Sequence, residues 1–184
     1  MVNILFIGDI VGRPGRNAVK RMVPQLREKE SFDLVIANGE NAAGGSGITG
    51  AMVKEIQEAG VDGITLGDHV WDQRGWPEEI HRYERVCRPA NLPSMTPGQP
   101  FLILETASGF RLGVFTLLGS QFMKIEADNP FGVVDAWMEK IKQAGCDAIF
   151  LEMHAETSSE KVAMGWTMDG SVSSVLGTHT HIPT

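Results

Sequence analysis

The sequence predicts an α/β fold in which mostly parallel strands alternate with amphipathic helices. Short apolar runs rich in β-branched residues, such as residues 34–37, are typical of buried strands. The segments between them carry apolar residues at helical spacing, as at Val19, Val23 and Leu26. This alternation is the pattern of a layered α/β domain. With 184 residues the chain can bury a sizeable core, and we expect one domain over residues 1–184.

The individual elements follow from the apolar runs and from the turn residues between them. The expected strands are residues 3–7, 34–37, 63–66, 86–88, 101–106, 111–118, 148–153 and 172–176. The expected helices are residues 16–29, 51–59, a short helix within 71–85, 131–144 and 158–168. Ala107-Ser108-Gly109 joins two strands closely enough to predict a hairpin, which is the one antiparallel pair in the pattern.

The composition excludes several classes of function. A net charge of −7 argues against non-specific binding to DNA or to an anionic membrane, because both need basic patches. No apolar stretch approaches the roughly 20 residues that a membrane span needs, and residues 1–10 have no basic leader pattern. Cys87 and Cys146 form no C-x-x-C pair, so neither a zinc knuckle nor a disulfide framework is indicated. We expect a cytoplasmic protein.

Polar side chains that can bind metal follow five of the apolar runs. In open α/β sheets the carboxyl ends of the strands line the ligand crevice, so these side chains should lie close together. They are Asp9, Glu40, Asn41, Asp68, His69, His154, His179 and His181. Imidazoles mixed with carboxylate and amide oxygens suit Fe, Mn, Zn, Co or Ni, and the lack of a thiolate argues against a closed structural zinc site.

The spacing of His179 and His181 indicates more than one ion. In an extended segment, side chains two residues apart point to the same face, which suits two neighbouring ions. A single histidine is more often a surface or core residue, but four at the strand ends beside several carboxylates are hard to explain that way. His81 lies in a polar segment away from the strand ends, and we assign it no role.

A dinucleotide-binding turn is the main rival interpretation of the first glycine-rich loop. Gly8, Gly12 and Gly15 do not have the G-x-G-x-x-G spacing. Asp9 would also place a negative charge against the pyrophosphate, and the histidines would stay unexplained. The glycines are better explained by a tight turn and close backbone packing.

Taken together, these motifs resemble the YmdB-like branch of the calcineurin-like metallophosphoesterases. They occur in the family's order from one end of the chain to the other. They are Gly8-Asp9 with Val11-Gly12, Asn38-Gly39-Glu40-Asn41-Ala42-Ala43-Gly44, Gly67-Asp68-His69 with Trp71-Asp72, Arg88-Pro89-Ala90-Asn91, His154-Ala155-Glu156 with Ser159-Glu160-Lys161, and Gly177-Thr178-His179-Thr180-His181. The resemblance implies a layered metallophosphoesterase-like sandwich of mixed sheets flanked by helices, with a C-terminal part that is short relative to the family.

The resemblance also implies an activity, a metal-dependent phosphoric diester hydrolase that opens 2′,3′-cyclic nucleotides or a related small phosphodiester. A hydroxide that bridges two transition-metal ions would attack phosphorus. Iron is the expected metal, with manganese or zinc as alternatives. One ion would take Asp9, Glu40, Asn41 and His181, and the second would take Glu40, Asp68, His154 and His179. His69 would be the proton donor. The family motif has Asn where this chain has Asp68.

Two other functions use the same residues. One is a phosphomonoesterase on the same site, and the other is a metal-binding regulatory or RNA-associated protein with weak or lost catalysis. The expected partner is a small phosphodiester or cyclic nucleotide, with no DNA and no membrane. The sequence stops three residues after His181, whereas members of the family continue further. An apparently truncated C-terminus leaves an unpaired sheet edge, so we expect a homo-oligomer.

Overall fold

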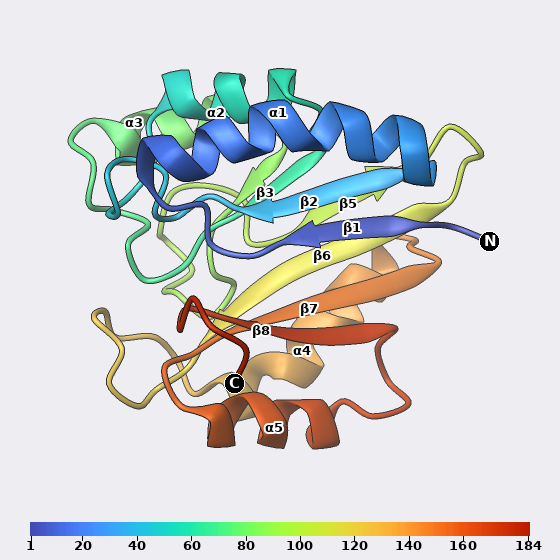
Figure 1. Cartoon of the computed structure of the whole chain (residues 1–184). Coiled ribbons are helices and arrows are strands. Elements are labelled where there is room, and N and C mark those ends of the chain that lie inside the picture. Colours follow the sequence, from blue (N-terminus) through green and yellow to red (C-terminus); the bar gives the residue numbers. More distant parts are fainter.

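The computed structural model describes residues 1–184, and it places two four-stranded sheets face to face between two layers of helices (Figure 1). The first sheet has the strand order β1 (Ile4–Ile7), β2 (Leu34–Asn38), β3 (Gly63–Thr65), β4 (Val86–Cys87), all parallel. The second has the order β5 (Leu102–Glu105), β6 (Arg111–Leu118), β7 (Ala148–His154), β8 (Ser174–Thr178). In it only β5 runs antiparallel to its neighbour.

The helices cover the outer faces of both sheets. Against the first sheet lie α1 (Gly12–Glu30), α2 (Gly50–Glu58) and the short α3 (Trp76–Glu79), which continues into the 3-10 turn η1 (Ile80–Arg82). Against the second lie α4 (Pro130–Gln143) and α5 (Ser158–Thr167). None of these helices is long and apolar enough to cross a membrane.

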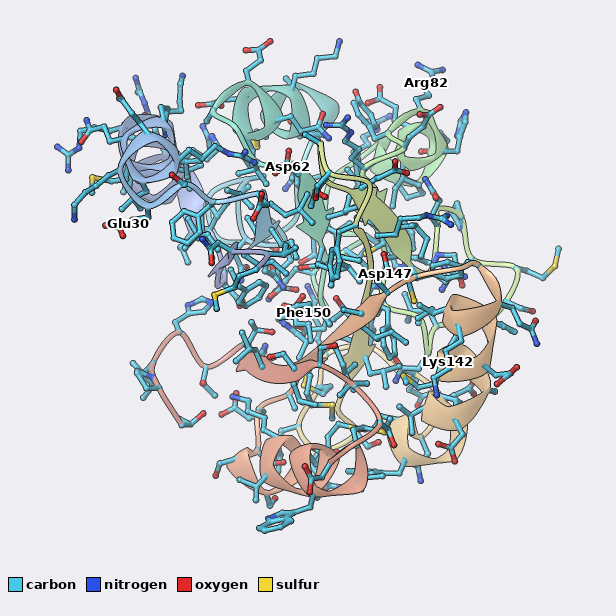
Figure 2. The ribbon with its side chains drawn as sticks, turned by 90° about the vertical axis from the view of Figure 1, so that its right-hand side faces the viewer. Glu30, Asp62, Arg82, Lys142, Asp147 and Phe150 are labelled. Atoms are coloured by element: carbon cyan, nitrogen blue, oxygen red, sulfur yellow. The ribbon has the colours of Figure 1, made fainter.

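Strand alternation separates the apolar side chains into three core layers. In β2, Leu34 and Ile36 face the second sheet, while Val35 and Ala37 pack under the helices of the first. This follows from the two-residue period of a strand, which sends successive side chains to opposite faces. Between the sheets, the rings of Phe6 and Phe150 lie 4.9 Å apart. Figure 2 shows Phe150 in this middle layer.

The fold brings the carboxyl ends of β1, β2, β3, β7 and β8 to one edge of the molecule. Parallel register aligns the ends within each sheet, where Ile7 pairs with Ala37 and His154 pairs with Thr178, and the two sheets point their carboxyl ends the same way (Figure 1). The loops after these strands therefore meet on the left-hand side of Figure 1, where the last residues of the chain also lie. Any site built from these loops must draw on both sheets.

The α/β layered fold with one antiparallel hairpin is confirmed, and the differences are at element ends. Helix α1 begins at Gly12, four residues before its expected start, because Pro14 lacks the amide hydrogen that the first helical turn leaves unpaired. Strand β7 extends through His154, and β8 lies two residues later than expected. The short helix expected within residues 71–85 is α3 with η1.

Candidate metal centre

The eight polar side chains singled out at the strand ends lie together at the carboxyl edge of the two sheets. Seven of them form a continuous chain of side-chain contacts, in the order Asp9, His181, Asn41, Glu40, His154, Asp68, His179. The eighth, His69, joins through its backbone amide, which donates to Glu40 Oε2 at 3.0 Å. The first sheet supplies the oxygens, and the second sheet supplies all the imidazoles except His69.

Four of these residues form a buried cluster at the centre of the site. His154 Nε2 lies 3.2 Å from Glu40 Oε1 and 3.1 Å from Asp68 Oδ1. His179 Nδ1 lies 3.4 Å from the same Asp68 oxygen and 3.2 Å from His154 Nε2. One ligand atom from each of the four lies within 4.8 Å of the others. The set is compact enough to surround one ion.

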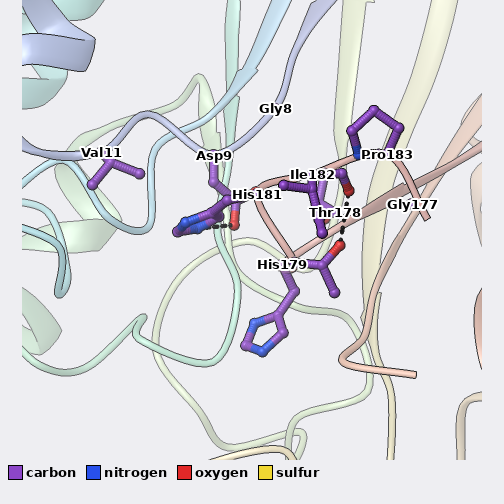
Figure 3. A pocket seen from close by; sticks show the side chains of 10 residues that line it. Gly8, Asp9, Val11, Gly177, Thr178, His179, His181, Ile182 and Pro183 are labelled. Carbon is purple, nitrogen blue, oxygen red and sulfur yellow. Dashed lines mark hydrogen bonds and ion pairs between the residues drawn. The ribbon is translucent and has the colours of Figure 1, made fainter. Parts of the chain in front are cut away.

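A second cluster adjoins the first through Glu40. His181 Nε2 lies 3.1 Å from Asp9 Oδ2 and 3.2 Å from the amide nitrogen of Asn41, which also donates to Glu40 Oε1 at 2.9 Å. The other oxygen of Asp9, Oδ1, is buried without a hydrogen-bond partner. His179 and His181 line a pocket of about 500 Å³ together with Asp9. Figure 3 shows His181 turned toward Asp9. The unpartnered oxygen is available to a cation.

The turn that carries His179 and His181 is not extended. Both residues have left-handed backbone angles, with φ of 88° and 56°, which non-glycine residues rarely adopt. The expectation that the two rings share one face of an extended segment was therefore wrong. Instead the rings diverge, with His181 beside Asp9 and His179 pointing away from it (Figure 3). His179 Nδ1 lies 3.4 Å from Asp68 Oδ1. Strained backbone of this kind is concentrated at functional sites.

Gly67 makes room for the buried cluster. A Cβ atom at this position would overlap with both Glu40 Oε2 and His154 Nε2. No larger residue can occupy the tip of the loop after β3 without displacing both side chains. The absence of a side chain at Gly67 thus leaves space for Glu40 and His154, in addition to any role of the glycine in the turn.

Charge is strongly coupled within the cluster. Burial favours the neutral carboxyl groups, but His154 and His179 outweigh it and hold the pKa of Asp68 well below its usual range. The pKa of Glu40 is also lowered, because His154 and the His69 amide outweigh its burial. Burial opposes a charge on His154, yet Glu40 and Asp68 raise its pKa well above the ordinary value. These shifts favour ionised carboxylates with a positive charge beside them, which either a protonated histidine or a metal ion can supply.

The arrangement of donors fits a metal in that position. The other ring nitrogen of His154, Nδ1, lies 2.9 Å from the hydroxyl of Thr178, which donates to Glu152. With its proton on Nδ1, a neutral His154 directs the lone pair of Nε2 at two carboxylate oxygens. Only a proton or a metal ion between these atoms removes that repulsion. Fixing the outer nitrogen of a histidine in this way is usual around metal ligands.

His69 lies beside the cluster and is held by a different set of partners. Its Nδ1 lies 2.6 Å from Asp72 Oδ2, which also accepts hydrogen bonds from Ser46 and Lys124. Burial of Asp72 favours the neutral acid, but Lys124, Ser46 and His69 together lower its pKa to about 2. An ionised Asp72 orients the ring and leaves Nε2 of His69 for another partner.

Glu152 is the main residue of the site region that the sequence pattern did not single out. It is fully buried between the sheets, where burial raises its pKa. It accepts hydrogen bonds from Asn38, Thr116 and Thr178 at 2.6–2.9 Å. With Asp9 and His154 it also forms a second group of possible ligands. Its position two residues before His154, on the same face of β7, was the signal that could have identified it.

Comparison with known proteins gives a consistent result. The model of the YmdB-like protein family matches residues 5–184. A 2′,3′-cyclic-nucleotide 2′-phosphodiesterase of Bacillus subtilis is 43% identical over 185 residues, which cover all of this chain and 68% of the relative.

Two solved structures share the fold over nearly the whole chain. A hypothetical protein from Thermus thermophilus has a TM-score of 0.89 and 42% identity, covering 98% of this chain and 69% of its own. A novel phosphatase from Mycoplasma pneumoniae has a TM-score of 0.90 and 34% identity, covering 100% and 66%. The chain thus spans about two thirds of the length of the relatives it matches.

Proposed function

The chain belongs to the YmdB-like protein family, and we propose that it is a di-metal phosphodiesterase that opens 2′,3′-cyclic nucleotides or a related small phosphodiester. Its relatives are named as a phosphodiesterase and a phosphatase, which supports a hydrolase of phosphate esters. The choice of diester over monoester rests on the more similar of the two, at 43% identity.

One observation carries the proposal, namely two adjoining clusters of ligand-type side chains that share Glu40. Glu40 Oε1 contacts both His154 of the buried cluster and Asn41 of the outer one. We propose that Asp9, Glu40, Asn41 and His181 hold one ion and that Glu40, Asp68, His154 and His179 hold the other. For Asn41 to use its oxygen, its amide must turn, because the structure directs its nitrogen at Glu40 and His181.

The residues then divide the chemistry between them. Bound transition metals would supply a nucleophile from water at neutral pH and neutralise charge on the phosphoryl oxygens. A ligand set of imidazoles and carboxylates without thiolate suits iron, with manganese or zinc as alternatives. Asp9, Glu40 and Asp68 hold the cations in place, and Gly67 gives the central side chains their space.

His69 is the proposed proton donor to the leaving ribose oxygen. Its ring is fixed through Nδ1 by Asp72, so Nε2 has a defined direction. A quarter of its side chain is exposed, which leaves it open to a bound substrate. Histidine suits this role because its ordinary pKa lies close to neutral pH.

The test combines metal analysis with turnover. The purified protein is analysed for metal before and after reconstitution with Fe, Mn or Zn, and is then assayed with 2′,3′-cyclic nucleotides and with nucleoside monophosphates. We expect two ions per chain and hydrolysis of the cyclic diesters. Faster hydrolysis of the monoesters would replace the proposal with a phosphomonoesterase. Metal without turnover of either class would favour a regulatory or RNA-associated role, and no metal would reject the proposal.

A further inference from the structure

A buried lysine lies beneath the turn that carries His179 and His181. Lys161, in the first half of α5, is only 8% exposed. Its ammonium group donates to the hydroxyl of Thr180 at 2.9 Å and to that of Thr184 at 3.0 Å. Thr180 is the residue between the two histidines, so the lysine reaches the turn at its centre.

The stem of Lys161 is fitted to the last strand. A Cβ atom on Gly177 of β8 would lie 2.6 Å from Cδ of Lys161. The glycine therefore lets the aliphatic chain cross β8 closely on its way to the turn. Gly177 belongs to the sequence Gly177-Thr178-His179-Thr180-His181, and this contact explains why that sequence begins with glycine.

A buried lysine at this position destabilises the folded protein. Burying an ammonium group costs free energy unless it is paired with an opposite charge, and both hydrogen-bond partners here are neutral hydroxyls. Burial lowers the pKa of Lys161, against the pull of the more distant Glu156 and Asp9 carboxylates. An apolar residue would fill the same space without this cost, so packing alone does not explain a lysine.

The backbone beside Lys161 is also held in place. The preceding residue, Glu160, accepts hydrogen bonds from the backbone amides of Ser120 and Gln121 and from the hydroxyl of Thr157. This ties the start of α5 to the loop after β6. Glu160 therefore connects the first turn of α5 to the loop after β6, and Lys161 connects it to the turn after β8. These two contacts account for the Ser159-Glu160-Lys161 motif.

We propose that Lys161 is a positioning residue for the metal centre, and that its ammonium holds the turn around Thr180 so that His179 and His181 point at the two clusters. The left-handed angles at both histidines are unfavourable for the backbone, so the turn needs an external restraint to keep them. Lys161 supplies it through its hydrogen bond to Thr180, the residue between the two histidines. This inference rests on the proposed metal site, because the rings are held for an ion.

The experiment compares Lys161→Met with Lys161→Arg and with Lys54→Met, a control at an exposed lysine of α2. Each protein, freed of metal with a chelator, is titrated with Co²⁺ and followed by visible absorption. We expect Lys161→Met to bind Co²⁺ about 10–100-fold more weakly, as is typical when a residue behind a metal ligand is lost. Lys161→Arg should recover part of the affinity, and Lys54→Met should match the unmodified protein.

Thermal unfolding of the metal-free proteins separates positioning from simple stability. Methionine removes a buried unpaired charge and keeps the stem, so the metal-free Lys161→Met protein should be at least as stable as the parent. Unchanged Co²⁺ affinity would overturn the inference, and so would a lowered unfolding temperature that accounts for the weaker binding. Thr180→Val provides a second test, because its effect on affinity and that of Lys161→Met should not add if they act through one contact.

Amide hydrogen exchange across residues 178–184 keeps the inference testable without metal. We expect faster exchange of this turn in metal-free Lys161→Met than in the parent. If the parent bound no Co²⁺, the proposed function would fail, but faster exchange would still support the restraint by Lys161. If the parent bound Co²⁺ and exchange and affinity were unaffected by the substitution, only the role of Lys161 would fail.

Discussion

The two sheets contribute chemically different halves of the site. The loops after β1, β2 and β3 supply Asp9, Glu40, Asn41 and Asp68, whose only metal-binding atoms are oxygens. Strand β7 supplies His154 and the turn after β8 supplies His179 and His181, which offer only nitrogen. The oxygen half is buried, with Glu40, Asn41 and Asp68 at most 3% exposed. In the nitrogen half only His154 is fully buried, whereas the side chain of His181 is 44% exposed.

The difference shows how charge and geometry are divided between the halves. Three carboxylates lie close together in the oxygen half, and they repel one another unless a cation lies between them. The nitrogen half supplies ligands of no fixed charge, and two of its three members lie on a turn with strained backbone. We infer that the oxygen half sets how strongly metal is attracted, and that the nitrogen half sets where each ion lies.

The largest effect should follow from Glu40→Ala, because Glu40 contacts both clusters. We expect this protein to lose both ions. Its turnover should therefore fall further than it does on loss of a general acid, which costs about 10²–10⁴-fold. His181→Ala removes only a proposed ligand of the outer cluster and should lose one ion. Metal content and circular dichroism check both variants. A folded Glu40→Ala protein that retained two ions would show that the halves are not joined through Glu40.

His69→Ala should reduce turnover by about 10²–10⁴-fold while both ions remain bound. The reason is that His69 contacts the oxygen half through its backbone amide, and its ring is held by Asp72. Turnover and metal content are measured together. His81→Ala is the matched control, since His81 lies exposed in η1, and it should behave as the parent. A metal-free His69→Ala protein would instead make His69 a ligand.

The sequence predicted the composition of both halves because the strand ends are marked by local signals. An apolar run, a glycine and then an acidic or imidazole side chain identifies a strand end facing the crevice, as at Gly67-Asp68. Parallel topology then brings such ends together, so the grouping of the eight residues follows from the fold. The layered α/β fold was predictable for the same reason, since each element carries its own periodicity.

The parts that the sequence did not reveal depend on contacts between distant segments. The turn at His179 and His181 was expected to be extended, and its left-handed angles are held by Lys161 from another element. Glu152 was missed because a carboxyl group inside a strand is unusual, and its partners come from three other strands. The turn has no signal in the local pattern, and the one signal for Glu152 is its position two residues before His154 on the same face of β7.

Stability of the metal-free protein should reveal the coupling between the halves through its dependence on pH. The folded-state pKa values of His154 and His179 are raised. The stability that these two histidines add to the fold is therefore complete below about pH 6.5 and is lost as pH rises through the raised values. The folded-state pKa values of Glu40 and Asp68 are lowered. The stability that these two carboxylates add to the fold is therefore present above their ordinary pKa values and is lost as pH falls through the lowered ones.

We therefore expect the free energy of unfolding of metal-free protein to decline above about pH 6.5, by roughly 1.4 kcal/mol for each unit by which a histidine is shifted. Bound metal requires neutral imidazoles, so the metal-loaded protein should not show this decline. Urea unfolding from pH 5 to pH 9, with and without metal, measures both curves. A metal-free protein equally stable at pH 6 and pH 9 would contradict the coupling.

The smallest predicted effect concerns Asp68, the carboxylate where the family motif has Asn. Its oxygens face His154, His179 and the backbone amide of Lys124. The ammonium of Lys124 is paired with Asp72, so it does not offset the charge of Asp68. Against the four positive charges of two divalent ions, Asp9, Glu40 and Asp68 bring three negative charges, whereas an Asn at this position would leave two.

With two divalent ions bound, Asp68→Asn should therefore raise kcat/KM for an anionic phosphodiester by about tenfold or less, on the order of 1 kcal/mol. The added net positive charge attracts the substrate more strongly and stabilises the charge that develops on phosphorus. With Fe(III) as one ion, the parent already has the extra charge, so the gain should shrink. The measurement is kcat/KM of both proteins in each metal form, with metal content verified. An equal or lower kcat/KM for Asp68→Asn in the divalent form would mean that Asp68 contributes as a ligand more than its charge costs.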